Sequence, residues 1–343
     1  MLTSLLDSQM LLILRRPGAI VGPIAKFLGV IYNGLFEFIY GFFHAGSLGI
    51  AIILFTVIVK LVLFPLMIKQ QKSSFKMQMM KPELDKIKNK YKDKKDQLSQ
   101  QKMAVEMRDF QKANGISMVG GCLPLLVQLP ILYALFYIFQ QPHIYVDVVA
   151  QNYTQIATAI IDIPVKLRMD VFQPYAQAFV DSNKLSSFDM QSIKDIVMLV
   201  NNLKLADWTN IIAQLGNNAG ALTDLLVAKD HLMTFCGIHL IYKAGLGFPG
   251  IIIPIMAAAT TWYQSKITMK STTGGQTDPN DPAAMMSKSM IYMMPAMMGI
   301  MTITMPAGLG LYWIISNIFT ISQQLLLNKY FKKKFEKEAK VNG

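Results

Sequence analysis

A lysine inside an apolar stretch is the residue in this sequence most able to carry chemistry. Lys60 interrupts the run FTVIVKLVLFPL. A charge at the centre of a bilayer costs about 2.5–3.5 kcal/mol on insertion scales, so it requires a wet cavity or a polar partner. No Asp or Glu occurs in the apolar segments defined below, which excludes an ion pair within the membrane. The end of its segment is about 12 Å of helix away, so we favour a wet cavity over snorkelling of the ammonium group.

Other polar side chains in the apolar segments are candidates for the wall of that cavity. Each one alone is more often a hydrogen-bonding residue between packed helices, but together they could wet a groove. These residues are Thr56, Gln128, Trp313, Ser316, Asn317 and Thr320.

Signatures of enzymes are missing from the sequence. It contains no HExxH, GxSxG, Walker A or CxxC motif, its four His are scattered, and neither Cys has a cationic neighbour. We therefore expect no catalytic residue, no metal ion and no cofactor.

The composition is typical of a membrane protein. Of 343 residues, 52% are hydrophobic and only 16% charged, and the mean hydropathy is +0.35. Ordinary soluble domains carry about 25% charged residues. Two Cys also exclude a disulfide scaffold. The formal charge of +12 requires concentrated basic segments.

Five segments are long and apolar enough to cross a hydrocarbon core of about 30 Å as helices. They span residues 46–68, 118–140, 245–264, 290–306 and 309–327. The corner Pro306-Ala307-Gly308 predicts that the last two form a helical hairpin. The expected fold is therefore an all-α polytopic membrane protein with a core of five transmembrane helices.

The distribution of Lys and Arg predicts the orientation, because basic residues concentrate in cytoplasmic loops. Segment 69–117 holds 13 basic and 6 acidic residues, the tail 328–343 holds 6 and 2, and the loop 265–289 holds 3 and 2. Segment 141–244 holds 7 basic and 9 acidic residues, and we expect a small helical extracellular insertion there. The result is an N-out, C-in protein of a plasma membrane.

The N-terminal segment 1–45 is harder to place. From Ile24 onward, apolar residues recur at steps of three and four, which predicts an amphipathic helix lying in the outer interface. A sixth span ending near His44 is an alternative, although it would leave almost no loop before the first span.

The cytoplasmic segment 69–117 predicts a helical hairpin with an apolar stripe on each helix. Met-rich stripes suit adaptable binding surfaces, and the alternative is that each stripe only packs on the other helix. The stripe residues include Met77, Met80, Leu84, Ile87, Met103 and Met107.

The C-terminal segment 328–343 interleaves basic and aromatic residues. Such a run just inside a membrane usually attracts anionic lipid, and ribosomal RNA is the alternative partner. Its lysines include Lys329, Lys332, Lys333, Lys334 and Lys337.

Long motifs resemble those of the YidC family of membrane protein insertases, whose relatives serve mitochondria and thylakoids. They are IVKLVLFPL before the Lys- and Met-rich hairpin, then VGGCLPLLVQLPILYALFYIF, FCGIHL, MMP and PAGLGLYWIISNIFTISQQLLL. The resemblance covers roughly residues 24–141 and 235–330.

The resemblance implies five core helices around a polar groove that is open to the cytoplasm and to lipid. A positive residue of the first core span lies in that groove in the family, and Lys60 is similar to it, although Arg is the commoner residue there. Gln128 and Trp313 match positions that line the groove. The cytoplasmic hairpin resembles a mobile lid. The long insertion and the lack of a large exported domain before the first span predict a monoderm-type bacterial protein, and the N-terminus shows no lipobox Cys.

The resemblance further implies an insertase without enzymatic activity that moves short hydrophilic flanks of nascent membrane proteins across the bilayer. Its expected partners are nascent membrane proteins, the lipid bilayer, the ribosome, the Sec translocon and targeting machinery, but not DNA. A secondary transporter would require inverted repeats and intramembrane carboxylates, and neither is found. A membrane anchor or assembly scaffold that binds ribosomes remains the alternative, and it leaves Lys60 without a purpose.

Overall fold

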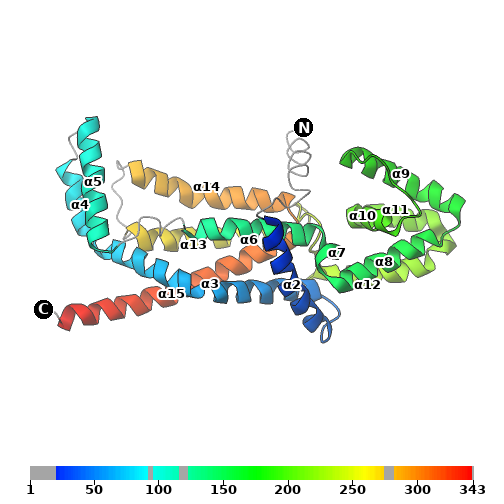
Figure 1. The fold of residues 1–343 in the computed structure, drawn as a ribbon, viewed down its shortest axis with the longest axis horizontal. Coiled ribbons are helices and arrows are strands. Elements are labelled where there is room, and N and C mark those ends of the chain that lie inside the picture. The colour runs from blue at the N-terminus through cyan, green and yellow to red at the C-terminus, as the bar shows by residue number, and fades with distance from the viewer. Residues whose placement is uncertain (1–20, 92–95, 116–122, 274–281, 342–343) are drawn as a thin grey trace. The chain divides into compact units, whose positions relative to one another are not determined.

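The computed structural model describes residues 21–91, 96–115, 123–273 and 282–341, and most of these residues are helical (Figure 1). The helices before the insertion are α2 (Val21–Tyr40), α3 (Ser47–Met79), α4 (Lys81–Lys90), α5 (Gln97–Ala113) and α6 (Leu123–Gln140). The helices within the insertion 141–244 are α7 (Pro142–Tyr145), α8 (Asp147–Ile161), α9 (Val165–Asn183), α10 (Ile193–Asn202), α11 (Leu205–Leu215), η2 (Gly216–Ala219) and α12 (Gly220–Met233). A two-residue pair of antiparallel strands, β1 (Thr234–Phe235) and β2 (Ile238–His239), precedes α13 (Ile252–Thr273), α14 (Pro282–Thr304) and α15 (Ala307–Val341).

The chain divides into two compact units. The first comprises residues 1–55, 131–250 and 304–309, and the second comprises residues 56–130, 251–303 and 310–343. Four helices, α3, α6, α14 and α15, therefore have residues in both units.

Helix α2 packs one face inside the first unit through Tyr32. This ring is fully buried, its hydroxyl donates to the Leu48 carbonyl oxygen at 3.2 Å, and it makes edge contacts with Phe55 and Phe139. The opposite face exposes Phe27 and Phe38, which are 66% and 65% accessible. The helix is thus apolar on two faces, as a helix between protein and lipid would be, and its place in the outer interface stays a prediction.

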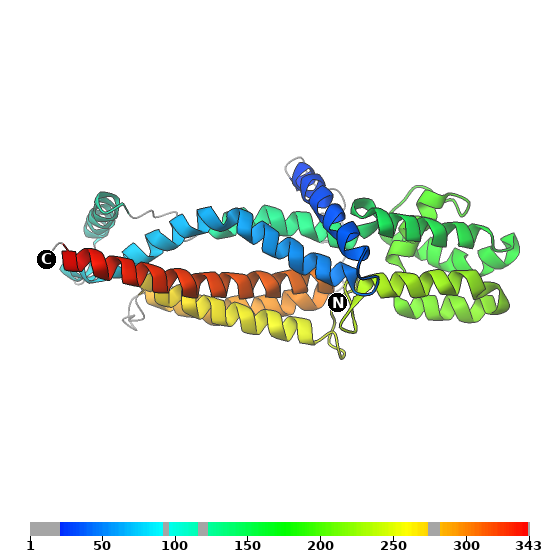
Figure 2. The same ribbon diagram turned by 90° about the horizontal axis from the view of Figure 1, so that it is seen from below.

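The insertion forms a helical cap, which we define as α8–α12. The turn before α10 shows why a helix begins there, because the Ser192 side chain accepts a hydrogen bond from the Asp195 backbone N–H. The residues Ile196, Leu199 and Val200 then repeat at helical spacing and are buried. Helix α8 lies against both α10 and α12, so it is the central helix of the cap (Figure 2).

A lysine ammonium group is enclosed at the centre of the cap. Lys229 is 3% exposed, and its Nζ donates to the Val200 carbonyl oxygen at 3.4 Å. The same atom lies 5.1 Å and 5.5 Å from the ring centroids of Tyr153 and Trp208. Burial lowers the pKa of Lys229 to about 7, and the neighbouring Asp230 opposes that shift only in part. The cap therefore holds a base whose charge changes near neutral pH.

Two histidines beside this lysine titrate in the same direction. His143 stacks on Tyr153, and burial lowers its pKa to about 4. His239 stacks on Tyr242, and burial, together with the charge of Lys229, lowers its pKa to about 4. Protonation of any of these three bases works against the folded cap.

The second unit contains a close-packed set of helices. An added Cβ on Gly310 of α15 would collide with Ile253 of α13, and one on Gly299 of α14 would lie 3.3 Å from the Ala258 Cβ of α13. Small residues at these positions let helix backbones approach closely. Helices α13, α14 and α15 accordingly run alongside one another (Figures 1 and 2).

Two helices extend beyond the spans expected from the sequence. Helix α3 contains Pro65 and continues past Ile68 to Met79, because no Pro or Gly occurs between Ile68 and Pro82 at the start of α4. Helix α15 continues through the basic tail to Val341. Among the described residues, α3 is the one helix both long and apolar enough to cross a membrane, whereas Gln128–Gln140 and Ile291–Thr304 are shorter apolar stretches. The five-span topology therefore stays a prediction.

The buried bases predict that the cap loses stability in acid. The folded-state pKa of Lys229 lies below its ordinary value of 10.5, so the unfolded cap binds more protons between about 7 and 10.5, and the free energy of unfolding rises with pH across this window. The histidines add a second rise between about 4 and 6.5. We expect hydrogen exchange of α8 and α12 amides, corrected for intrinsic rates, to slow with rising pH.

The variant Lys229→Met provides the control, because it keeps the length of the side chain and removes the base. It should abolish the alkaline rise and leave the rise due to the histidines. Protection that does not change with pH in the intact protein would contradict the assignment of Lys229 as a buried base.

Candidate functional site around Lys60

Lys60 is held among three helices of the second unit. It lies on α3 and is 8% exposed. Its Nζ donates to the Gln128 side-chain oxygen on α6 at 3.4 Å and to the Thr320 hydroxyl on α15 at 3.3 Å. In the described part of the chain, no ion pair includes Lys60. Neutral acceptors therefore take two of the three N–H donors of the ammonium group, as the absence of carboxylates in the apolar run requires.

Both acceptors are themselves hydrogen-bonded on their far sides. The Gln128 amide nitrogen donates to the Tyr312 hydroxyl, and the Thr320 hydroxyl donates to the Ser316 carbonyl oxygen at 2.8 Å. Each partner of Lys60 therefore turns an acceptor toward the ammonium group. We call Lys60, Gln128, Thr320 and Tyr312 the lysine cradle.

A second polar cluster joins α15 to α13. The Trp313 indole N–H donates to the Thr261 hydroxyl at 2.9 Å, and the Asn317 amide lies 3.0 Å from the hydroxyls of Thr260 and Thr261. In either orientation of its amide, Asn317 bonds to α13. We call these four residues the α13–α15 clasp.

The two clusters use two stripes of the same helix. Tyr312, Ser316 and Thr320 recur every four residues, and Trp313 and Asn317 recur at the same step, one residue further on. Residues four apart share a helix face. One stripe of α15 therefore carries the cradle and the other carries the clasp.

The residues expected from the sequence divide between these clusters. Gln128 and Thr320 contact Lys60 directly, whereas Trp313 and Asn317 bond to α13. Thr56 lies one turn before Lys60 and is fully buried. The sequence reasoning missed Tyr312 and the adjacent Thr260 and Thr261. A pair of hydroxyl residues in an apolar segment was the signal available for the latter.

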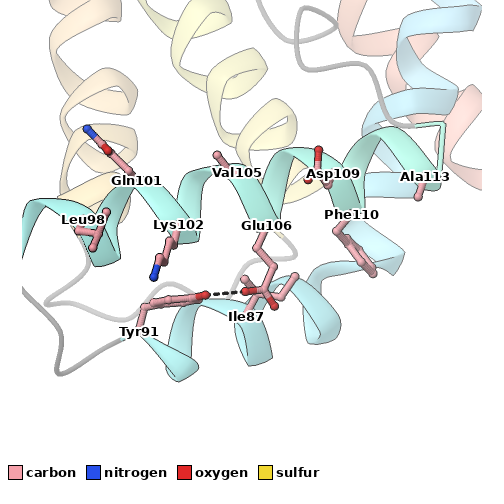
Figure 3. Close-up of a pocket in the computed structure, with 10 residues that line it drawn as sticks. All are labelled: Ile87, Tyr91, Leu98, Gln101, Lys102, Val105, Glu106, Asp109, Phe110 and Ala113. Atoms are coloured by element: carbon pink, nitrogen blue, oxygen red, sulfur yellow. Dashed lines mark hydrogen bonds between the residues drawn. The ribbon is translucent and has the colours of Figure 1, made fainter.

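Helices α4 and α5 enclose a surface pocket of about 810 Å³, which Figure 3 shows. Its apolar wall includes Ile87 of α4 and Val105 and Phe110 of α5. The Glu106 carboxylate accepts from Lys90 at 3.0 Å and from the Tyr91 hydroxyl at 2.8 Å, which lowers the pKa of Glu106. These bonds hold α4 and α5 together.

Of the six stripe residues named above, Ile87 lines this pocket, and so do Tyr91 and Phe110, which continue the same two stripes. Met77 belongs to α3, Met80 lies at the junction of α3 and α4, and Leu84 is buried. Met103 and Met107 are half-buried on another face of α5. Val105 and Leu98 of the pocket wall were missed because they stand among polar residues, whereas Met residues dominated the sequence pattern.

The basic tail is a helix packed against the end of α3. Phe331 is 3% exposed, and its ring lies 6.2 Å from that of Phe75, which also stacks on Phe335 at 5.6 Å. The Gln71 amide donates to the Asn328 side-chain oxygen at 2.7 Å. These contacts hold the tail, while all five lysines identified in the sequence are exposed: Lys329, Lys332, Lys333, Lys334 and Lys337.

Nothing in the described part of the chain resembles a metal centre, since no group of three or more His, Cys, Asp or Glu residues is placed to hold an ion. The chemistry of the site is that of a buried ammonium group and neutral hydrogen-bonding side chains.

Helix α3 is long and apolar enough to cross a membrane, and it carries a lysine that polar side chains of other helices hold. These features are typical of a membrane protein. Comparison with known sequences gives the family. The profile of the 60Kd inner membrane protein family matches residues 38–334, and the chain belongs to this family.

Curated relatives carry one name. The chain is 30% identical over 294 residues to membrane protein insertase YidC 2 of Listeria innocua, covering 86% of this chain and 68% of the relative. It is 27% identical over 315 residues to membrane protein insertase YidC of Oceanobacillus iheyensis, covering 90% and 87% of the two chains. A further relative is YidC 2 of Bacillus anthracis, with 29% identity over 279 residues, or 81% and 71% of the two chains.

The clasp predicts a measurable contribution to helix packing. Hydrogen bonds between membrane helices contribute about 0.6 kcal/mol on average and at most about 1.7 kcal/mol. We expect Asn317→Ala to lower the free energy of unfolding by an amount in this range, measured by equilibrium unfolding in mixed micelles. Ser322→Ala is the control, because the exposed Ser322 bonds only within its own helix. Equal stabilities of the two variants would contradict a stabilising clasp.

Proposed function

We propose that this protein is a bacterial plasma-membrane insertase that moves short hydrophilic flanks of nascent membrane proteins across the bilayer. Membership of the 60Kd inner membrane protein family and the insertase names of its relatives support this proposal. The observation that carries the mechanism is the ammonium group of Lys60, which neutral acceptors from two other helices hold inside an apolar run. No enzymatic step is part of the proposal.

Lys60 provides a positive charge within the membrane. A flank with acidic residues gains attraction from this charge, which offsets part of the cost of its desolvation. Lys keeps the charge of the commoner Arg but lacks its planar fork of donors, so attraction rather than bidentate binding is the main effect. Gln128, Ser316 and Thr320 extend the polar surface near the charge, and the hydrophobic segment of the substrate passes into lipid.

The remaining segments receive and hold the substrate. In this proposal the apolar pocket between α4 and α5 takes the first apolar residues of the chain, and the Met residues of the hairpin adapt to different sequences. The exposed lysines of the α15 tail contact either ribosomal RNA or anionic lipid. The topology is N-out and C-in with five spans, and the Sec translocon and targeting factors are further partners.

Lys60→Met tests the charge directly in proteoliposomes. The substrate is a single-span protein with a short acidic exported flank, and the measured quantity is the fraction of flank protected from protease. We expect the variant to lower this fraction several-fold, because the attraction is lost, and Lys60→Arg to retain most of it. A matched substrate with Asn and Gln in place of Asp and Glu should be affected less.

Lys69→Met is the matched control, since it makes the same change on the same helix at an exposed position. If Lys60→Met and Lys69→Met protect equally well, Lys60 has no role in insertion. If the intact folded protein protects no flank, a membrane anchor that binds ribosomes becomes the better description of the chain.

The tail is tested separately by replacing Lys332, Lys333 and Lys334 with Gln. In nanodiscs of neutral lipid, we expect ribosome co-sedimentation to fall and its dependence on salt to weaken, because fewer phosphate contacts form. Glu336→Gln serves as the control on the same helix. Unchanged ribosome binding by the triple variant would contradict the ribosome contact and leave anionic lipid as the partner of the tail.

A further inference from the structure

We propose that Tyr312 is a positioning residue, which holds the Gln128 amide so that its oxygen faces Lys60 and one N–H of the ammonium group remains for the substrate. This inference rests on the proposed function, since it concerns the same site. It adds to the site a residue, Tyr312, that does not contact the substrate. It also specifies that Lys60 offers one N–H donor to the substrate.

The argument begins with the two ends of the Gln128 amide. An amide has an acceptor oxygen at one end and two N–H donors at the other. The oxygen of Gln128 faces Lys60, and the nitrogen faces the Tyr312 hydroxyl. The reversed amide would point N–H donors at an ammonium group that has no acceptor. The ammonium group therefore selects this orientation, and the Tyr312 hydroxyl, which accepts from the amide nitrogen, anchors the amide in it.

Tyr312 is suited to this task by its burial. It is 1% exposed, so surrounding side chains fix the ring and water cannot replace its hydroxyl. A buried amide donor that lost this partner would be left unsatisfied, which is unfavourable. Without the hydroxyl, the amide is no longer anchored on this side, and we expect it to rotate away from Lys60.

Thr320 is fixed in the same sense by a different contact. Its hydroxyl proton is donated to the Ser316 carbonyl oxygen, so its lone pairs are left for Lys60. An ammonium group has three N–H donors. Within the described residues, two of these are used by Gln128 and Thr320. The third donor suits a carboxylate or a backbone carbonyl of the passing chain.

The first experiment measures Lys60 itself. Purified full-length protein in nanodiscs is treated with an amine-acylating reagent, and mass spectrometry follows the acylation of Lys60 relative to Lys69. We expect Tyr312→Phe to raise the relative rate at Lys60 several-fold, because one acceptor no longer holds the amine. Tyr263→Phe, at a half-exposed position on α13, is the control and should leave the rate unchanged. An unchanged rate in Tyr312→Phe would overturn the inference.

The second experiment distinguishes positioning from a general structural role by a double-mutant cycle. We expect Tyr312→Phe to lower the insertion rate of the acidic-flank substrate about two- to five-fold, which corresponds to a lost hydrogen bond of about 0.5–1 kcal/mol. In a Gln128→Leu background, Tyr312→Phe should have no further effect. Equal losses in both backgrounds would show that Tyr312 acts on packing and would overturn the inference.

A further variant covers the case in which Tyr312→Phe does not fold. Gln128→Glu keeps both contacts by making Tyr312 the donor, and it pairs with Lys60. It should slow acylation of Lys60 and reduce insertion of acidic flanks more than of neutral ones; equal effects would overturn the inference.

If Lys60→Met leaves insertion intact, the proposed function fails. If Lys60 matters and Tyr312→Phe is neutral in both experiments, only the present inference fails.

Discussion

The ammonium group of Lys60 requires hydrogen-bond acceptors, and this requirement determines which side chains surround it. Lys60 lies in an apolar run with no carboxylate in the expected spans, so its partners must be neutral and must come from other helices. Gln128 and Thr320 meet this need, and each is held by a further group. A neutral set of acceptors leaves the positive charge uncancelled, which an ion pair would not. In the proposed function, this uncancelled charge is what attracts an acidic flank.

Helix α15 separates this charged site from the packing of the helices. Tyr312 and Thr320 on one stripe belong to the cradle, and the Ser316 carbonyl oxygen between them accepts from Thr320, while Trp313 and Asn317 bond to α13. The close contact at Gly310 adds to the second interface. Polar residues that look equivalent in the sequence thus have different tasks, depending on which face of one helix carries them.

The sequence identifies the parts of this site better than it identifies their connections. Lys60 is evident as a charge among apolar residues, and Gln128 and Thr320 follow as polar residues of other apolar segments. Tyr312 is not evident, because a tyrosine in such a segment usually indicates packing or an interface, and only the facing helix shows what its hydroxyl meets. The helix boundaries are also displaced, since α3 and α15 continue past their apolar residues where no breaker stops them. In the hairpin, the apolar stripes are visible in the sequence, but their Met residues do not line the pocket, whereas Leu98 and Val105 do.

The continuity of α15 has a mechanical consequence. Thr320 and the lysines that begin at Lys332 lie on the same uninterrupted helix, about 18 Å apart along its axis. A helix transmits a pull or a twist along its length, because its backbone hydrogen bonds resist local stretching. A partner that binds the tail therefore binds the same helix that carries Thr320, an acceptor of the Lys60 ammonium group. A displacement of the tail along the helix axis would therefore also displace Thr320, which is one of the two acceptors of Lys60.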